Sequence, residues 1–134
     1  MPEPVFVGLI LADRVITEDN GKKGIIGTFT QFHARQFPAF FPPWFLYAAV
    51  TNLAGEHSFS ITVASDESQQ VVFSVNGQFT VDDQRKVVEL VVPVLHAPFP
   101  SAGTYAVIFQ VDGEQICSRL LELAAMGGEE SRPV

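Results

Sequence analysis

The chain has 134 residues, which is typical of one domain, and 47% of them are hydrophobic, a proportion that excludes a disordered chain. Its eight basic residues are scattered and are outnumbered by fifteen acidic ones, so nucleic acid is not an expected partner. The single cysteine, Cys117, excludes an internal disulfide framework and is typical of a reducing compartment.

The first predicted element is a β-strand from Val5 to Asp13. Its side chains are apolar on both faces, which indicates a central strand or one that is covered on both sides. The charged side chain before it is Glu3, so the basic region of an export signal is missing, and the run is too short to span a bilayer. We therefore expect a cytoplasmic protein without membrane contact. We expect Asp13 to be buried and paired, with a structural role.

A charged turn at residues 18–24 is followed by a second predicted strand, Ile25 to His33. The segment from Phe29 to Tyr47 then concentrates large aromatic side chains around three prolines. Another strand is expected from Trp44 to Leu53. From His57 to Ser65 apolar and polar residues alternate, which predicts a half-buried antiparallel strand.

Two hairpins are predicted in the second half of the chain. Asn76-Gly77 marks the first turn, and a three-residue loop, Val75-Asn76-Gly77, places Phe73 opposite Phe79. The strand from Val87 to Leu95 contains Pro93, which favours a sheet edge or a strand end. In the last hairpin, a two-residue turn at Asp112-Gly113 pairs Phe109 with Ile116 and Tyr105 with Leu120, and it sets Cys117 opposite Ile108.

About eight or nine short strands with turn signals between them predict an all-β fold, a single antiparallel β-sandwich of immunoglobulin-like or jelly-roll-like character. A small barrel is the alternative. The sandwich is expected to occupy residues 1–126. The polar, glycine-containing residues 127–134 are expected to form a disordered tail.

The residues that could carry chemistry do not form a recognisable site. His33, His57 and His96 lack metal-ligand spacing, and we interpret the last two as solvated turn residues. Cys117 falls within a strand, where a small buried hydrophobe is the expected role. The acidic pairs in the loops are typical of solvated turns rather than calcium sites. We predict no catalytic residue, no cofactor and no metal.

The aromatic and proline segment allows three interpretations. It can be a connection that crosses between the sheets, with its phenylalanines closing an open end of the sandwich. It can be an interface, since aromatic residues are enriched at buried protein contacts. It can also be a ligand platform, on which Trp44 and Tyr47 stack against sugar rings.

Several short motifs resemble a family of small bacterial proteins of unknown function, which are β-sandwich domains found as stand-alone chains. The residues that carry the resemblance span nearly the whole chain: Ala12-Asp13, Gly27-Thr28-Phe29, Phe37-Pro38, Gly55-Glu56-His57, Pro100 to Tyr105 and Val111 to Glu114. The resemblance implies the sandwich fold and a bacterial cytoplasmic setting. It implies no activity and supplies no catalytic residue.

These observations together predict a non-enzymatic binding or structural module that acts through protein–protein contacts. We expect a homo-oligomer, most simply a dimer, that buries part of the segment at residues 37–47. The residues expected at that interface are Phe37, Phe40, Phe41, Trp44 and Tyr47. A module that binds a small ligand or a carbohydrate is the alternative.

Overall fold

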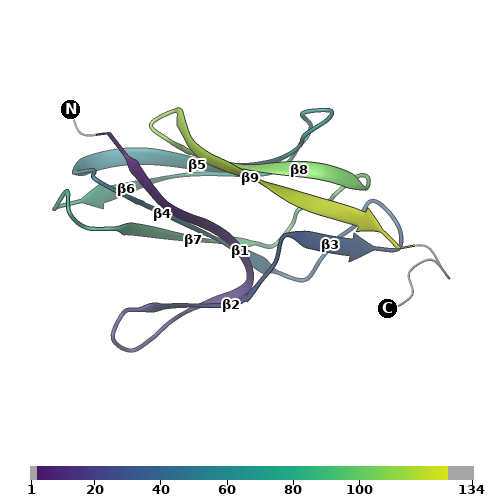
Figure 1. The fold of residues 1–134 in the computed structure, drawn as a ribbon, viewed down its shortest axis with the longest axis horizontal. Coiled ribbons are helices and arrows are strands. Elements are labelled where there is room, and N and C mark those ends of the chain that lie inside the picture. The colour runs from purple at the N-terminus through teal and green to yellow at the C-terminus, as the bar shows by residue number, and fades with distance from the viewer. Residues whose placement is uncertain (1–2, 127–134) are drawn as a thin grey trace.

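A computed structural model describes residues 3–126, and these residues form nine β-strands in two sheets (Figure 1). The all-β sandwich prediction is confirmed. The four-stranded sheet has the order β2-β1-β4-β7, and the five-stranded sheet has the order β3-β9-β8-β5-β6. The strands are β1 (Val5–Thr17), β2 (Lys23–Thr28), β3 (Gln31–Ala34), β4 (Trp44–Thr51), β5 (Gly55–Ser65), β6 (Val71–Val81), β7 (Val88–Val94), β8 (Gly103–Val111) and β9 (Glu114–Ala125).

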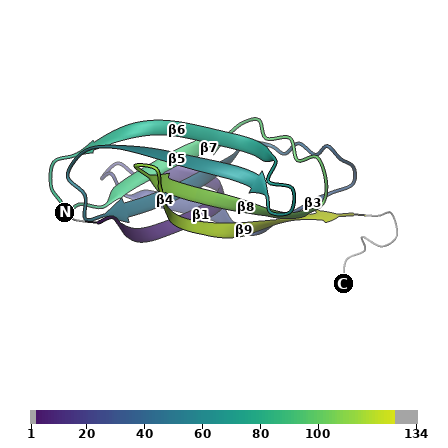
Figure 2. The same ribbon diagram turned by 90° about the horizontal axis from the view of Figure 1, so that it is seen from above.

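The core lies between the two sheets, which are stacked as two layers in Figure 2. In the strands that contribute to it, alternate residues point into the core, as the period of two in a strand requires. In β8 the inward residues Tyr105, Val107 and Phe109 are buried, while the residues between them are half-buried. The guanidinium of Arg119 on β9 donates to the carbonyl oxygen of Leu9 on β1 and so ties one sheet to the other.

The predicted strand from Ile25 to His33 is wrong, because the chain divides it between the two sheets. β2 pairs with β1 in the four-stranded sheet, whereas β3 pairs with β9 in the five-stranded sheet. Gly27 has a φ of 73°, a left-handed conformation that interrupts a regular strand. The β3–β9 pair is parallel, so the sandwich is not wholly antiparallel as predicted.

The hairpin predicted at Asn76-Gly77 is also wrong, because β6 runs straight through both residues. Asn76 pairs with Ser60 and Gly77 with Phe59 on β5, and the chain reverses instead at residues 66–70. A Cβ on Gly77 would lie 2.6 Å from Cε1 of Phe59. Glycine at position 77 therefore leaves room for an aromatic ring of the neighbouring strand and does not form a turn.

The last hairpin has the predicted two-residue turn but a different register. Asp112 and Gly113 both have positive φ, as the tight hairpin turn requires, and Val111 pairs with Glu114. An irregularity between Phe109 and Gln110 then places Phe109 opposite Cys117 rather than Ile116. Beyond it, Tyr105 pairs with the buried Leu121, and Leu120, which we expected to point inward, is exposed.

Other sequence predictions hold for particular strands. β7 lies at a sheet edge, as Pro93 indicated, and β5 alternates as predicted. Asp13, predicted to be buried, is exposed. The tail predicted at residues 127–134 lies outside the described residues. Within residues 3–126, no helix is long and apolar enough to cross a membrane.

Candidate protein-binding site

The aromatic and proline segment crosses from the five-stranded sheet to the four-stranded sheet between β3 and β4. Its middle is held in place by a two-residue bridge between Ala39 and Phe99. The N–H of Ala39 donates to the carbonyl of Phe99 over 2.8 Å, and the N–H of Phe99 donates back over 3.0 Å. The segment is therefore an anchored crossing, with its backbone fixed next to the residues that follow β7.

Aromatic rings from this segment and its neighbours close one end of the sandwich. Phe41 stacks on Phe32, with ring centroids 4.1 Å apart and planes within 11°. Trp44 contacts Phe32 edge-on at 5.5 Å, and Phe41 contacts Phe99 edge-on at 5.8 Å. The two edge-on contacts have the distances and angles that aromatic pairs prefer, and the stacked pair is packed more closely. The segment therefore supplies core at this end, as the first of the three interpretations held.

The five residues predicted for the interface lie at different depths. Trp44 is 3% exposed and Tyr47 is 9% exposed, so neither presents a ring to a ligand or a partner. Phe37 and Phe41 are partly buried against the core. Phe40 is 63% exposed, and it follows the anchored Ala39 directly. Of the five predicted residues, Phe40 is thus the most exposed.

A second apolar surface lies on the outer side of the four-stranded sheet. The register aligns Ile10, Tyr47 and Val91 in one row across β1, β4 and β7. The adjacent row holds Ala12, Phe45 and Pro93. Because the alternate residues of these strands belong to the core cluster, both rows face outward. We call this surface the apolar face: Ile10, Phe45, Val91 and Pro93 are its partly or fully exposed residues, and Ala12, Tyr47 and Ala49 are buried among them.

Glu89 is a charged residue beside this face, and its carboxylate accepts a hydrogen bond from Tyr47. Glu89 pairs with Ala49 in the β4–β7 register, and the hydroxyl of Tyr47 donates to its carboxylate over 2.5 Å. Burial and this hydrogen bond raise the pKa of Tyr47 to about 12. The phenol therefore stays protonated at neutral pH and holds the carboxylate at one position.

Sequence reasoning missed Ile10, Phe45 and Val91 as partly exposed residues, although the sequence carried a signal for Ile10. The run from Val5 to Ala12 is apolar on both faces, and this pattern predicted a strand covered on both sides. The five-stranded sheet covers one side of β1, and within residues 3–126 no strand packs over the other side, where Ile10 is partly exposed. An apolar run on both faces of a predicted strand, with only one face covered in the fold, therefore indicates an apolar surface on the other face.

The residues considered for catalysis or metal binding are far apart or already engaged. Nδ1 of His57 lies 2.6 Å from the carboxylate of Asp112, and Nε2 lies 2.9 Å from the carbonyl oxygen of Ala54. Since carbonyl and carboxylate oxygens only accept, both ring nitrogens donate, as they do in the protonated ring. His33 and His96 are exposed elsewhere. Residues 3–126 contain no group of three metal-ligating side chains.

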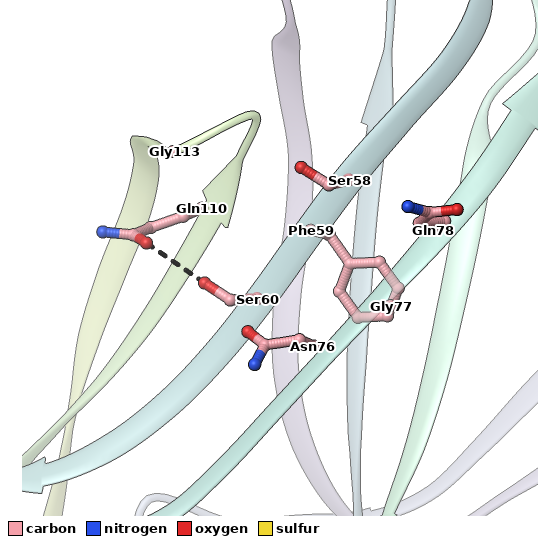
Figure 3. Close-up of a pocket in the computed structure, with 8 residues that line it drawn as sticks. All are labelled: Ser58, Phe59, Ser60, Asn76, Gly77, Gln78, Gln110 and Gly113. Atoms are coloured by element: carbon pink, nitrogen blue, oxygen red, sulfur yellow. Dashed lines mark hydrogen bonds between the residues drawn. The ribbon is translucent and has the colours of Figure 1, made fainter.

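The outer side of the five-stranded sheet has the opposite character to the apolar face. Figure 3 shows a hollow there, in which the hydroxyl of Ser60 donates to the side-chain oxygen of Gln110 over 3.1 Å. Its other lining residues are mainly small or polar: Ser58, Phe59, Asn76, Gly77, Gln78 and Gly113. Trp44 and Tyr47, which would stack on a sugar in the ligand-platform interpretation, are buried elsewhere. The hollow therefore lacks the predicted stacking platform.

Comparison with known proteins gives a family without an assigned role. A model described as "Family of unknown function (DUF6941)" matches residues 8–124, which include nearly the whole sandwich. A search of curated proteins found no significant match.

Proposed function

We propose that this chain, which belongs to the DUF6941 family of unknown function, is a non-enzymatic binding module that acts through contacts with another protein. The observation that carries the proposal is the apolar face. Phe45, which lies within the predicted segment at residues 37–47, is a partly exposed residue of β4, the strand that runs through that face, and Phe40 adds an exposed ring near the same end of the sandwich. The setting that we propose is a bacterial cytoplasm, for which Cys117 as the single cysteine is the support.

The chemistry of the face suits a protein partner better than a small polar ligand. Its side chains are aliphatic and aromatic, and the neighbouring carboxylate of Glu89 is already hydrogen-bonded. Partly exposed large side chains such as Ile10, Phe45 and Val91 stand around the small and buried Ala12 and Ala49. A broad surface of this kind excludes water well when another apolar surface covers it.

The histidine best placed for chemistry is occupied by the fold. Both ring nitrogens of His57 are used, one by Asp112 and the other by the carbonyl of Ala54. A ring with both nitrogens donating offers no lone pair to a metal or to a substrate proton. This engagement supports a non-enzymatic role.

Site-specific photocrosslinking in the native cell tests the proposal. A benzophenone amino acid placed at Phe45 or at Phe40 should form adducts with a protein of defined mass. The same group at Ser118, an exposed residue of β9, is the control and should give no such adduct. Val91→Glu should abolish the adduct from position 45, because it introduces an unpaired charge into the contact. Equal adducts at position 118, or none at positions 40 and 45, would overturn the proposal.

A further inference from the structure

The two sheets end in four edge strands, and three of these are protected against pairing with another chain. β3 has only four residues. β2 has six residues and contains Lys23, Gly24 and Gly27. β7 contains Pro93, which has no N–H to donate. Short length, lysine and proline are among the features by which natural sheets prevent edge-to-edge association.

β6, the fourth edge, has none of these protections. It is eleven residues long, and in the described part of the chain its outer edge pairs with no strand. From Ser68 to Val81 the sequence contains no charged residue and no proline. Valine, phenylalanine and threonine, which favour strands, make up much of it. The bulge at Val72 lies near its beginning, and Phe73–Val81 then runs in regular register with β5.

The hydrogen bonds of Ser58 on β5 show which backbone groups of β6 are open. Its N–H donates to the carboxylate of Asp112 and its carbonyl accepts from the N–H of Asp112, so both groups face the β8 side. Because successive residues of a strand point their polar groups to opposite sides, Phe59 and Ile61 face β6. Their partners Gly77 and Val75 return those bonds. The residues between them therefore turn N–H and C=O to the open edge: Ser74, Asn76, Gln78 and Thr80.

We propose that a second copy of this chain pairs with this open edge, β6 against β6 in antiparallel orientation around a two-fold axis at Gly77. The regular stretch Phe73–Val81 is centred on Gly77, so this register uses all four open residues. Ser74 then meets the partner's Thr80, and Asn76 meets the partner's Gln78, each pair exchanging two hydrogen bonds. On the inner face, Phe73 meets the partner's Val81, and Val75 meets the partner's Phe79.

The pairing is complementary at every position of the stretch. Apolar residues lie opposite apolar residues on the inner face, and uncharged polar residues lie opposite each other on the outer face. At the axis the two glycines face each other without a side chain, so nothing obstructs the approach of the backbones. No carboxylate lies within the paired stretch, although the chain carries a net charge of −7.

The proposed pairing also limits the assembly to two copies. Pairing two β6 strands joins the five-stranded sheets into one, whose remaining edges are the two short β3 strands. A two-fold contact uses the same edge on both copies, so it leaves no free β6 for a third copy. The edge lies in the other sheet from the apolar face, which stays available for the partner of the proposed function.

Proline substitution combined with sedimentation tests the pairing. The wild-type chain should sediment as a dimer at micromolar concentration, with no larger species as concentration rises. Gln78→Pro removes an outward N–H and leaves the β5–β6 ladder complete, so it should weaken the dimer about a hundredfold or more. Gln78→Ala, which removes the side chain and keeps the N–H, is the matched control and should remain dimeric. Unchanged circular dichroism would confirm that both variants fold.

Hydrogen exchange of the wild-type chain provides a test that needs no variant. The amides of Ser74, Asn76, Gln78 and Thr80 should exchange more slowly above the dissociation constant than below it. A wild-type monomer at all concentrations would overturn the pairing and leave the apolar face untested. A dimer that survives Gln78→Pro but is lost with Val91→Glu would overturn it too, by placing the second copy on the apolar face.

Discussion

At the scale of single residues, the contact between His57 and Asp112 ties the beginning of β5 to the turn between β8 and β9. The hydrogen bond to Asp112 raises the pKa of His57, and the hydrogen bond from His57 lowers the pKa of Asp112. The backbone N–H of Ser58 donates to the same carboxylate over 3.0 Å. One carboxylate thus holds together two segments that are 54 residues apart in sequence.

The opposite shifts define the pH range in which this contact stabilises the fold. The raised pKa of His57 makes its contribution complete below the unfolded value of about 6.5, and the contribution is lost as pH rises through the folded value. The lowered pKa of Asp112 makes its contribution complete above about 3.9, and this is lost as pH falls through the folded value. Between about pH 4 and 6.5 both contributions are present.

Asp112→Asn should therefore destabilise the protein most in that range, by about 0.5–1 kcal/mol, a value reduced because Asp112 is half-exposed to solvent. Asparagine tolerates the φ of 52° at this position, so the backbone of the turn is kept. Urea unfolding at several pH values measures the difference from wild type. Asp66→Asn, in an exposed turn, is the control. A difference that does not shrink at alkaline pH would contradict the protonated His57.

At the scale of strands, β6 shows why a strong local turn signal can mislead. Asn-Gly between apolar runs is the best short-range indication of a hairpin, and it predicted a turn here. The apolar residues Phe73, Val75, Phe79 and Val81 all have odd numbers. One uninterrupted strand, with Gly77 on the same face, would therefore also place all of them on one side. The ring of Phe59 packs against Gly77 and favours the uninterrupted strand over the hairpin. Phe59 lies on another strand, so the sequence around Gly77 does not reveal this contact.

Gly77→Ala should destabilise the protein by about 1 kcal/mol, because the new Cβ would lie 2.6 Å from the ring of Phe59. In a Phe59→Ala background the same substitution should instead stabilise by about 0.5 kcal/mol, since alanine suits a strand better than glycine once the ring is absent. A double-mutant cycle from urea unfolding measures the change of sign. If the changes in unfolding free energy of the two substitutions are additive, the ring of Phe59 is not the reason for glycine at position 77.

At the scale of the whole molecule, periodicity was sufficient for the fold class and the β5 alternation, and Pro93 was sufficient for the edge position of β7. It was not sufficient where one residue changes the register. The irregularity between Phe109 and Gln110 replaces Ile116 with Cys117 opposite Phe109 and brings Leu121 rather than Leu120 into the core. The proposed binding surface was predictable in part for the same reason. Aromatic density identified the segment at residues 37–47, but the depth of each ring depends on the sheet beneath it.

The depths of these rings lead to a prediction about stability across the molecule. Trp44 lies in the core, in contact with Phe29 and Phe32, so Trp44→Ala should cost about 3–5 kcal/mol through the cavity that it leaves. Phe40 is 63% exposed, so Phe40→Ala should cost less than about 0.5 kcal/mol. Urea unfolding of the two variants at equal protein concentration measures both values.

Comparing the stabilities of Trp44→Ala and Phe40→Ala distinguishes a ring that stabilises the fold from a ring that is available for contact with a partner. A folded Phe40→Ala variant with wild-type stability and a loss of crosslinking from position 45 would mean that Phe40 and the apolar face bind one partner together. A large loss of stability on Phe40→Ala would instead place this ring in a contact within the native assembly. Because a partner copy adds stability by mass action, repeating the measurement at tenfold lower protein concentration distinguishes that contact from one within the chain.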